Sequence, residues 1–182
     1  MTRLLLYRHA KSDWGDARLA DKDRPLNARG RSAAPLMARY IVEAGLLPDR
    51  ILCSTSQRTR ETLLPLLTLL DRPADIHLRE EVYDRSDEDY LGVIRQFGGH
   101  AHTLMIVGHN PATEASARSL VKDRSGPDWI DLAVKFPTAG LAVIDFQHSD
   151  WSQITLQSGR LDRFIKPRAL ERESTHPPAE LG

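Results

Sequence analysis

The sequence predicts an α/β domain of three layers, with helices on both faces of a mostly parallel central sheet. Short apolar runs alternate with longer segments of helical periodicity, the pattern of strand–helix–strand units. The length of 182 residues is that of one ordinary domain with a sizeable core. We expect one domain over residues 1–170 and a mobile polar tail over residues 171–182, which contain Pro177 and Pro178.

Six short apolar runs are the predicted strands, and their lengths suit buried strands of a sheet. They are Arg3–Tyr7, Arg50–Ser54, Asp75–Leu78, Thr103–Val107, Leu141–Phe146 and Gln153–Gln157.

A helix is predicted over about residues 28–44, with Asn27 as its N-cap and Gly45 just beyond its end. Pro35 lies inside this stretch and predicts a kink or an irregular second turn. Segment 122–138 is rich in Asp, Lys, Gly and Pro, and we expect a loop or partial helix over one edge of the site. Further helices are expected at about residues 57–70, 87–97 and 111–121.

Composition excludes several classes of protein. Lys plus Arg and Asp plus Glu are equal at 25 each, so overall charge favours neither nucleic acid nor an anionic membrane as a partner. The single cysteine, Cys53, excludes an internal disulfide and fits a reducing compartment. No apolar run is long enough for a signal peptide or a membrane span, so a cytoplasmic location is expected.

Basic and imidazole side chains follow three of the predicted strands. Arg8 and His9 come directly after the first strand, and His109 follows the fourth. Arg58 lies in the turn after the second strand. Ligands of open parallel sheets bind at the carboxyl ends of the strands, so these side chains predict one phosphate site.

These residue types suit transfer of a phosphoryl group, which depends on positioning and charge compensation. The guanidinium forks of Arg8 and Arg58 match phosphate oxygens two at a time. A neutral imidazole between them can attack phosphorus and form an N-phosphohistidine intermediate, which water then hydrolyses. The second imidazole, as a hydrogen-bond donor, would stabilise the transferring group.

Three motifs, in this order, resemble the histidine phosphatase superfamily, whose fold is phosphoglycerate mutase-like. They are the Arg-His pair at 8–9, the turn at 54–58 and the Gly-His pair at 108–109. The Arg-His-Ala-Lys-Ser form of the first motif and the Arg-Pro-Leu segment that begins at Arg24 are similar to the small SixA-type phosphohistidine phosphatases. The resemblance covers about residues 3–146.

The resemblance implies a role for each residue of the motifs. His9 would be the phosphorylated nucleophile, Arg8 and Arg58 would clamp the phosphoryl oxygens, and His109 would complete the pocket. The family needs no metal, and no cofactor is expected. Two further residues are expected to bind phosphate or substrate: Ser12 and Asn110.

The general acid is the open question in this site. Superfamily members that cleave phosphate esters carry a carboxylate in a loop past the third strand, because an alkoxide leaving group needs a proton. Glu81 is our choice here, with Glu80 and Asp84 as alternatives. A phosphohistidine substrate has less need of an acid, because its nitrogen leaving group can already be protonated.

The expected substrate is therefore phosphohistidine in a protein. A small phosphate ester and a phosphoglycerate mutase-like reaction are alternatives, and an inactive module that binds phosphate or a phosphoprotein is an alternative of another class. A cysteine-dependent phosphatase is excluded, since four residues rather than five separate Cys53 from Arg58 and none of them is Gly. The sequence does not predict the oligomeric state.

The remaining polar and aromatic residues have simpler interpretations. Arg60 is expected to be a solvated or salt-bridged helix residue. His100 and His102 share a spacing that metal sites use, but without a matching Cys or carboxylate pattern a polar turn is favoured. Trp14 and Trp129 could line the pocket, although packing is the favoured role of each.

Overall fold

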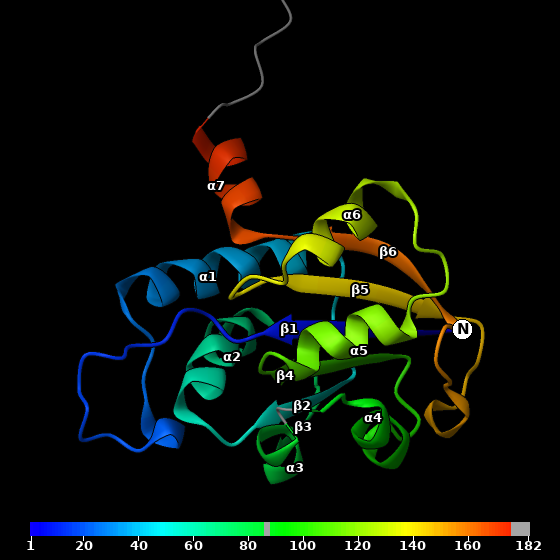
Figure 1. The fold of residues 1–182 in the computed structure, drawn as a ribbon, viewed down its shortest axis with the longest axis horizontal. Helices are drawn as coiled ribbons and strands as arrows, with labels where there is room; N and C mark the ends of the chain where they lie inside the picture. Colours follow the sequence, from blue (N-terminus) through cyan, green and yellow to red (C-terminus); the bar gives the residue numbers. More distant parts are fainter. Residues whose placement is uncertain (86–87, 176–182) are drawn as a thin grey trace, which may run out of the picture.

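The structure, a computed structural model, describes residues 1–85 and 88–175. Its six strands form one sheet in the order β3-β2-β4-β1-β5-β6 (Figure 1). β5 is antiparallel to both of its neighbours, and the other pairings are parallel, so five strands point the same way. The strands are β1 (Thr2–Arg8), β2 (Arg50–Ser54), β3 (Asp75–Arg79), β4 (Thr103–Gly108), β5 (Leu141–Phe146) and β6 (Gly159–Ile165).

The connections between the strands contain helices, as the predicted α/β class requires. The α-helices are α1 (Ala28–Glu43), α2 (Gln57–Leu69), α3 (Glu80–Asp84), α4 (Leu91–Phe97), α5 (Ala112–Leu120), α6 (Gly126–Val134) and α7 (Pro167–Thr175). Two 3₁₀ helices are η1 (Asp21–Asp23) and η2 (Trp151–Gln153). Among the described residues, no helix is both long and apolar enough to cross a membrane.

Two hydrophobic cores, one on each face of the sheet, make the three layers. In β1, Leu4 and Leu6 belong to the core that includes residues of α4 and α5, whereas Leu5 and Tyr7 belong to the core with α1 and α2. Alternate side chains of a strand point to opposite faces, so a central strand buried on both faces must be apolar throughout. The predicted three-layer α/β fold is confirmed.

The prediction of the sixth strand was wrong. Residues 153–157 form the end of η2 and a turn, and the sixth strand lies further along, at β6. β6 is an edge strand in which Arg160 and Asp162 are charged, and Arg160 pairs with Asp145 of β5. Because charged side chains interrupt its apolar pattern, periodicity alone did not detect this strand.

The helices agree with the expected ones in part. α1 begins after Asn27, whose side chain accepts a hydrogen bond from the Gly30 amide at 3.0 Å, and it continues unbroken through Pro35. The helix expected over 87–97 begins at Leu91, and segment 122–138 contains α6. α7 crosses the expected domain boundary at residue 170, while residues 176–182 of the expected tail lie outside the described residues.

Candidate active site

The strand order brings the predicted site residues together. β4 lies between β1 and β2, and Arg8 is paired in register with Gly108 of β4. A cavity of about 670 Å³ opens at the carboxyl ends of these strands. All six predicted residues other than the acid line this cavity: Arg8, His9, Ser12, Arg58, His109 and Asn110.

His9 is a neutral imidazole held in one tautomer. Its Nδ1 lies 2.7 Å from the carbonyl oxygen of Ala10, and a carbonyl can only accept, so Nδ1 carries the ring proton. The lone pair of Nε2 is therefore free. Burial, reinforced by the charges of Arg58 and Arg8, lowers the pKa of His9 to about 3. The ring therefore stays unprotonated at neutral pH, and its Nε2 has the lone pair that a nucleophile needs.

Arg8, at the end of β1, is held by the chain that follows α6. Its Nη1 donates to the carbonyl oxygen of Phe136 at 2.6 Å, and the amide of Asn110 donates to the same oxygen at 3.1 Å. The Nε of Arg8 is buried and has no acceptor among the described residues. Arg8 itself lines the cavity, so its guanidinium brings a positive charge to this space.

Arg58 lies in the first turn of α2 and is tied to Asp21 of η1. Nη1 donates to the Asp21 carbonyl oxygen at 2.6 Å, and Nη2 donates to its carboxylate at 2.9 Å. The Tyr83 hydroxyl donates to the same carboxylate at 3.0 Å. Burial raises the pKa of Asp21, but the hydrogen bonds from Arg58 and Tyr83 outweigh it, so the pKa is lowered and this carboxylate stays ionised.

His109 faces His9 across the cavity, with the ring centroids 5.0 Å apart. Its Nε2 lies 2.7 Å from the Ser54 hydroxyl, and its Nδ1 lies 3.3 Å from Nη2 of Arg58. Burial, with His9 and Arg58, lowers the pKa of His109 to about 3. Both imidazoles are neutral, and the Ser54 hydroxyl can donate to or accept from His109, so either tautomer of that ring can form.

The loop that carries His9 is braced by α1 and α2. The Asn27 amide donates to the Lys11 carbonyl oxygen at 2.9 Å, and the Ala10 amide donates to the Thr62 hydroxyl at 2.9 Å. A Cβ on Gly30 would lie 2.2 Å from the Lys11 carbonyl oxygen. Glycine is therefore needed at this position so that the first turn of α1 can approach the loop.

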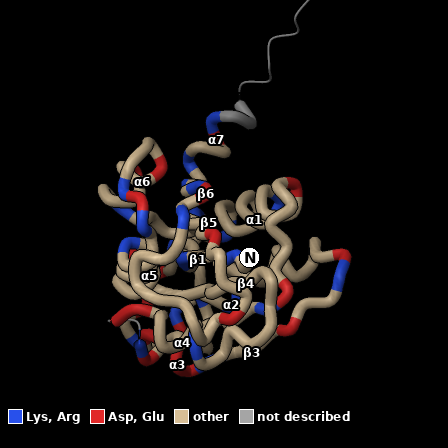
Figure 2. The backbone as a smooth tube through the Cα atoms, turned by 90° about the vertical axis from the view of Figure 1, so that its right-hand side faces the viewer, with Lys and Arg blue, Asp and Glu red and all other residues tan. Residues whose placement is uncertain are grey.

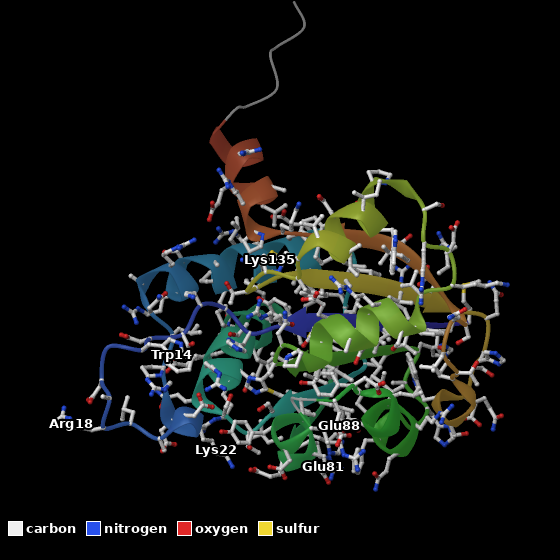
Figure 3. The ribbon with its side chains drawn as sticks, in the orientation of Figure 1. Trp14, Arg18, Lys22, Glu81, Glu88 and Lys135 are labelled. Carbon is white, nitrogen blue, oxygen red and sulfur yellow. The ribbon has the colours of Figure 1, made fainter. Side chains whose placement is uncertain are left out.

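The three candidate carboxylates past β3 lie in different places. Glu81, our choice of acid, does not line the cavity, and in Figure 3 it lies on α3. Glu80 is engaged by Lys22 at 2.5 Å and by the Thr55 hydroxyl at 2.6 Å. Asp84 does line the cavity. Because α3 begins directly at Glu80, the two glutamates fall in its first turn, and the residue one turn later reaches the cavity.

Sequence reasoning missed Asp21 and assigned Trp14 to packing. Trp14 lines the cavity and is 64% exposed (Figure 3), so packing is not its role. Its indole Nε1 donates to the Ser12 hydroxyl at 3.1 Å, and the guanidinium of Arg24 stacks on its ring at 4.3 Å. The sequence contains one signal for Trp14 and Asp21, which is their position between the first motif and the segment that begins at Arg24.

Comparison with known proteins identifies the family. The sequence profile of the histidine phosphatase superfamily (branch 1) matches residues 4–92. A solved structure provisionally assigned as the phosphohistidine phosphatase SixA of Agrobacterium tumefaciens is 33% identical, with a TM-score of 0.75, covering 91% of this chain and 98% of that one. This chain belongs to the histidine phosphatase superfamily.

Two further proteins are similar to this chain over nearly their whole length. An uncharacterized protein of Mycobacterium tuberculosis is 35% identical over 164 residues, which are 88% of this chain and 99% of the relative. The protein histidine phosphatase SixA, solved with tungstate, matches with a TM-score of 0.68 at 21% identity, covering 93% of this chain and 99% of that one. At that identity the likeness shows the fold alone. Both of these solved neighbours bear the name of a phosphatase.

Proposed function

We propose that this protein is a phosphohistidine phosphatase that transfers the phosphoryl group from a protein substrate to His9 and then to water. One observation carries the proposal. The Nδ1 proton of His9 is committed to the Ala10 carbonyl at 2.7 Å, so Nε2 presents a lone pair in a cavity lined by two guanidiniums. An imidazole in this state is poised for attack on phosphorus rather than for donation of a proton.

The first step forms one bond and breaks one. Nε2 of His9 attacks phosphorus, and the P–N bond of the substrate breaks. If the other ring nitrogen of the substrate is protonated, the substrate leaves as neutral imidazole and takes no proton from the enzyme. His9 then carries phosphorus on Nε2 and hydrogen on Nδ1, which makes its ring a good leaving group. Water attacks phosphorus and the P–Nε2 bond breaks. One proton of water stays on the phosphate as its hydroxyl, the other passes to solvent, and His9 is restored as neutral imidazole with its proton on Nδ1.

Three groups can compensate the charge of the transferring group. Arg8 offers the guanidinium that lines the cavity, and Arg58 offers Nη2, which lies 3.3 Å from Nδ1 of His109. A phosphoryl oxygen beside Arg58 would also accept from Nδ1 of His109 if the Ser54 hydroxyl turned to donate to Nε2. In this scheme His109 stabilises charge as a neutral donor.

The positions and charge states of Asp21 and Glu81 support phosphohistidine over ordinary esters. Asp21 is kept ionised by Arg58 and Tyr83, and Glu81 lies outside the cavity. An alkoxide leaving group would need a proton from such a residue, whereas a protonated phosphohistidine would not. Asp84 is the observation that favours the second candidate, a phosphatase of small phosphate esters, because it lines the cavity.

A phosphoenzyme assay tests the proposal. The protein is mixed with a phosphohistidine peptide labelled on phosphorus, quenched within milliseconds to seconds, and split between acid and base. We expect label on His9 that is lost in acid and retained in base, and no label on His9→Asn. His102→Asn is the matched control, because His102 is an exposed imidazole outside the cavity.

A substrate panel completes the test. Phosphohistidine peptide, phosphoserine peptide and an aryl phosphate are compared by kcat/KM. Faster turnover of the phosphoserine peptide than of the phosphohistidine peptide, with that turnover lost on Asp84→Asn, would replace the proposal with the ester phosphatase. If His9 acquires no label and no substrate is turned over, the protein is instead an inactive module that binds phosphate or a phosphoprotein.

A further inference from the structure

A second cavity, of about 820 Å³, adjoins the candidate active site. Lys11 and Thr138 line both cavities, so the two adjoin at these residues. Its other walls come from the beginning of α1, from the end of α6 with the chain that follows it, and from the beginning of α7. Figure 1 shows α7 beside α1 at the end of the molecule that also holds α6. We call this cavity the side groove.

The side groove has an excess of positive charge. Its lining includes five basic side chains and two acidic ones, although the whole chain has 25 of each. One acid, Asp131, is paired with Lys166 at 2.5 Å. Figure 2 shows Lys and Arg on α7. The basic residues are Lys11, Arg29, Lys135, Lys166 and Arg168.

Three of these cations are free to bind an anionic partner. Arg29, Lys135 and Arg168 are exposed and form no ion pair with any of the residues that the structure describes. Figure 3 shows Lys135 near the beginning of β5, above the end of β1 that carries Arg8 and His9. Such a cluster attracts acidic side chains and sets their register more than it adds raw affinity.

The lining between the charges is mainly apolar. Val134 is 78% exposed, and it lines the groove together with the exposed Ala28 and the half-buried Pro137. An exposed apolar surface rimmed by polar residues is typical of an interaction site. The volume exceeds what one phosphate would fill and falls in the range of cavities that hold several side chains.

We propose that the side groove binds an acidic polypeptide segment that flanks the phosphorylated residue of the substrate. This inference rests on the proposed function, and it names the part of the substrate that lies outside the phosphate pocket. The shared residues Lys11 and Thr138 mean that a chain whose phosphorylated residue enters at His9 can continue directly into the groove. Its acidic side chains would pair with Arg29, Lys135 and Arg168, and an apolar residue would lie against Val134.

The experiment compares two variants that each remove two positive charges. Lys135→Ala/Arg168→Ala removes them from the groove, and Arg39→Ala/Lys122→Ala removes them from exposed positions outside it. Binding of a fluorescent acidic peptide without phosphate is measured by anisotropy, which does not depend on turnover. KM is then measured for phosphohistidine peptides with acidic and with neutral flanks.

We expect the groove variant to weaken acidic-peptide binding by about tenfold, since each exposed ion pair contributes a few-fold. KM for the acidic phosphopeptide should rise by a similar factor, while KM for the neutral one and kcat for both stay unchanged. The difference should shrink at about 0.5 M salt, where exposed charges are screened. The outside variant should bind the acidic peptide within about twofold of the parent protein, as expected for cations beyond direct contact.

Three results would overturn the inference. Equal affinity for acidic and neutral peptides would show that the groove does not read charge. An equal loss of peptide affinity in both variants would show that binding depends on the net charge of the protein and not on the groove. Tighter binding to phosphatidylserine vesicles than to peptide, abolished in the groove variant, would make the groove a membrane contact. Failure of the proposed function is distinguishable, because it would abolish phosphohistidine turnover while peptide binding could persist.

Discussion

The two buried imidazoles make a sharp prediction about stability against pH. His9 is 8% exposed and His109 is 3% exposed, and burial lowers the pKa of each to about 3. In the unfolded chain each ring has a pKa of about 6.5. Below that value the unfolded state binds protons that the folded state does not, so folding stability is complete above about pH 6.5 and is lost as the pH falls toward the folded pKa.

The magnitude follows from the unfolded pKa. At about pH 5, one and a half units below it, each ring lowers the free energy of unfolding by about 2 kcal/mol relative to pH 7, and the pair lowers it by about 4 kcal/mol. The loss of free energy of unfolding at about pH 5 hardly depends on the pKa of the folded state, because a folded pKa of about 4 gives nearly the same loss. Carboxylates with lowered pKa values, such as Asp21, lose their contribution mainly below about pH 5. The window between about pH 6.5 and pH 5 therefore isolates the imidazoles.

Urea unfolding followed by circular dichroism, in buffer without phosphate, measures the effect. We expect the loss between about pH 7 and pH 5 to fall to about 2 kcal/mol in His9→Asn and in His109→Asn, and to nearly zero in the double variant. His102→Asn, which removes an exposed imidazole, should keep the full loss. Each variant is compared with itself at two pH values, so any change in packing caused by the substitution cancels. An equal loss in parent protein and double variant would refute the assignment of both rings as buried and neutral.

Three further predictions concern single residues. Arg58→Lys should lower kcat/KM for a phosphohistidine peptide by roughly 10²–10³-fold, because it removes the planar fork; a drop below about fivefold would exclude Arg58 from charge compensation. Glu81→Gln should change kcat/KM by less than about twofold, in steady-state assays of both the phosphohistidine peptide and an aryl phosphate. Asp84→Asn should lower the turnover of the aryl phosphate only. The reverse pattern would restore Glu81 as the acid. Gly30→Ala should cost about 2 kcal/mol, roughly 4–8 °C in Tm by calorimetry, because its Cβ would lie 2.2 Å from the Lys11 carbonyl oxygen; an unchanged Tm would mean that the loop moves freely.

The sequence by itself determined the fold class and the centre of the site. The strands buried on both faces have apolar centres. The strand order makes neighbours of three strands, and at or just beyond their carboxyl ends lie Arg8, His9, Arg58 and His109. These residues could be predicted because a parallel sheet places the ends of its strands along one edge. The edge strand β6 could not, because its charged residues pair with one another and with Asp145, which no local pattern reveals.

Only the tertiary structure decided the surroundings of that centre. The tautomer of His9 depends on the Ala10 carbonyl, and the orientation of Arg8 depends on Phe136, which is 128 residues away in the sequence. Whether Glu81 or Asp84 reaches the cavity depends on where α3 begins. Sequence spacing indicates which chemical groups share an edge of the sheet, but hydrogen-bond partners come from segments that meet only when the chain has folded, and those partners set the proton positions on which phosphoryl transfer depends.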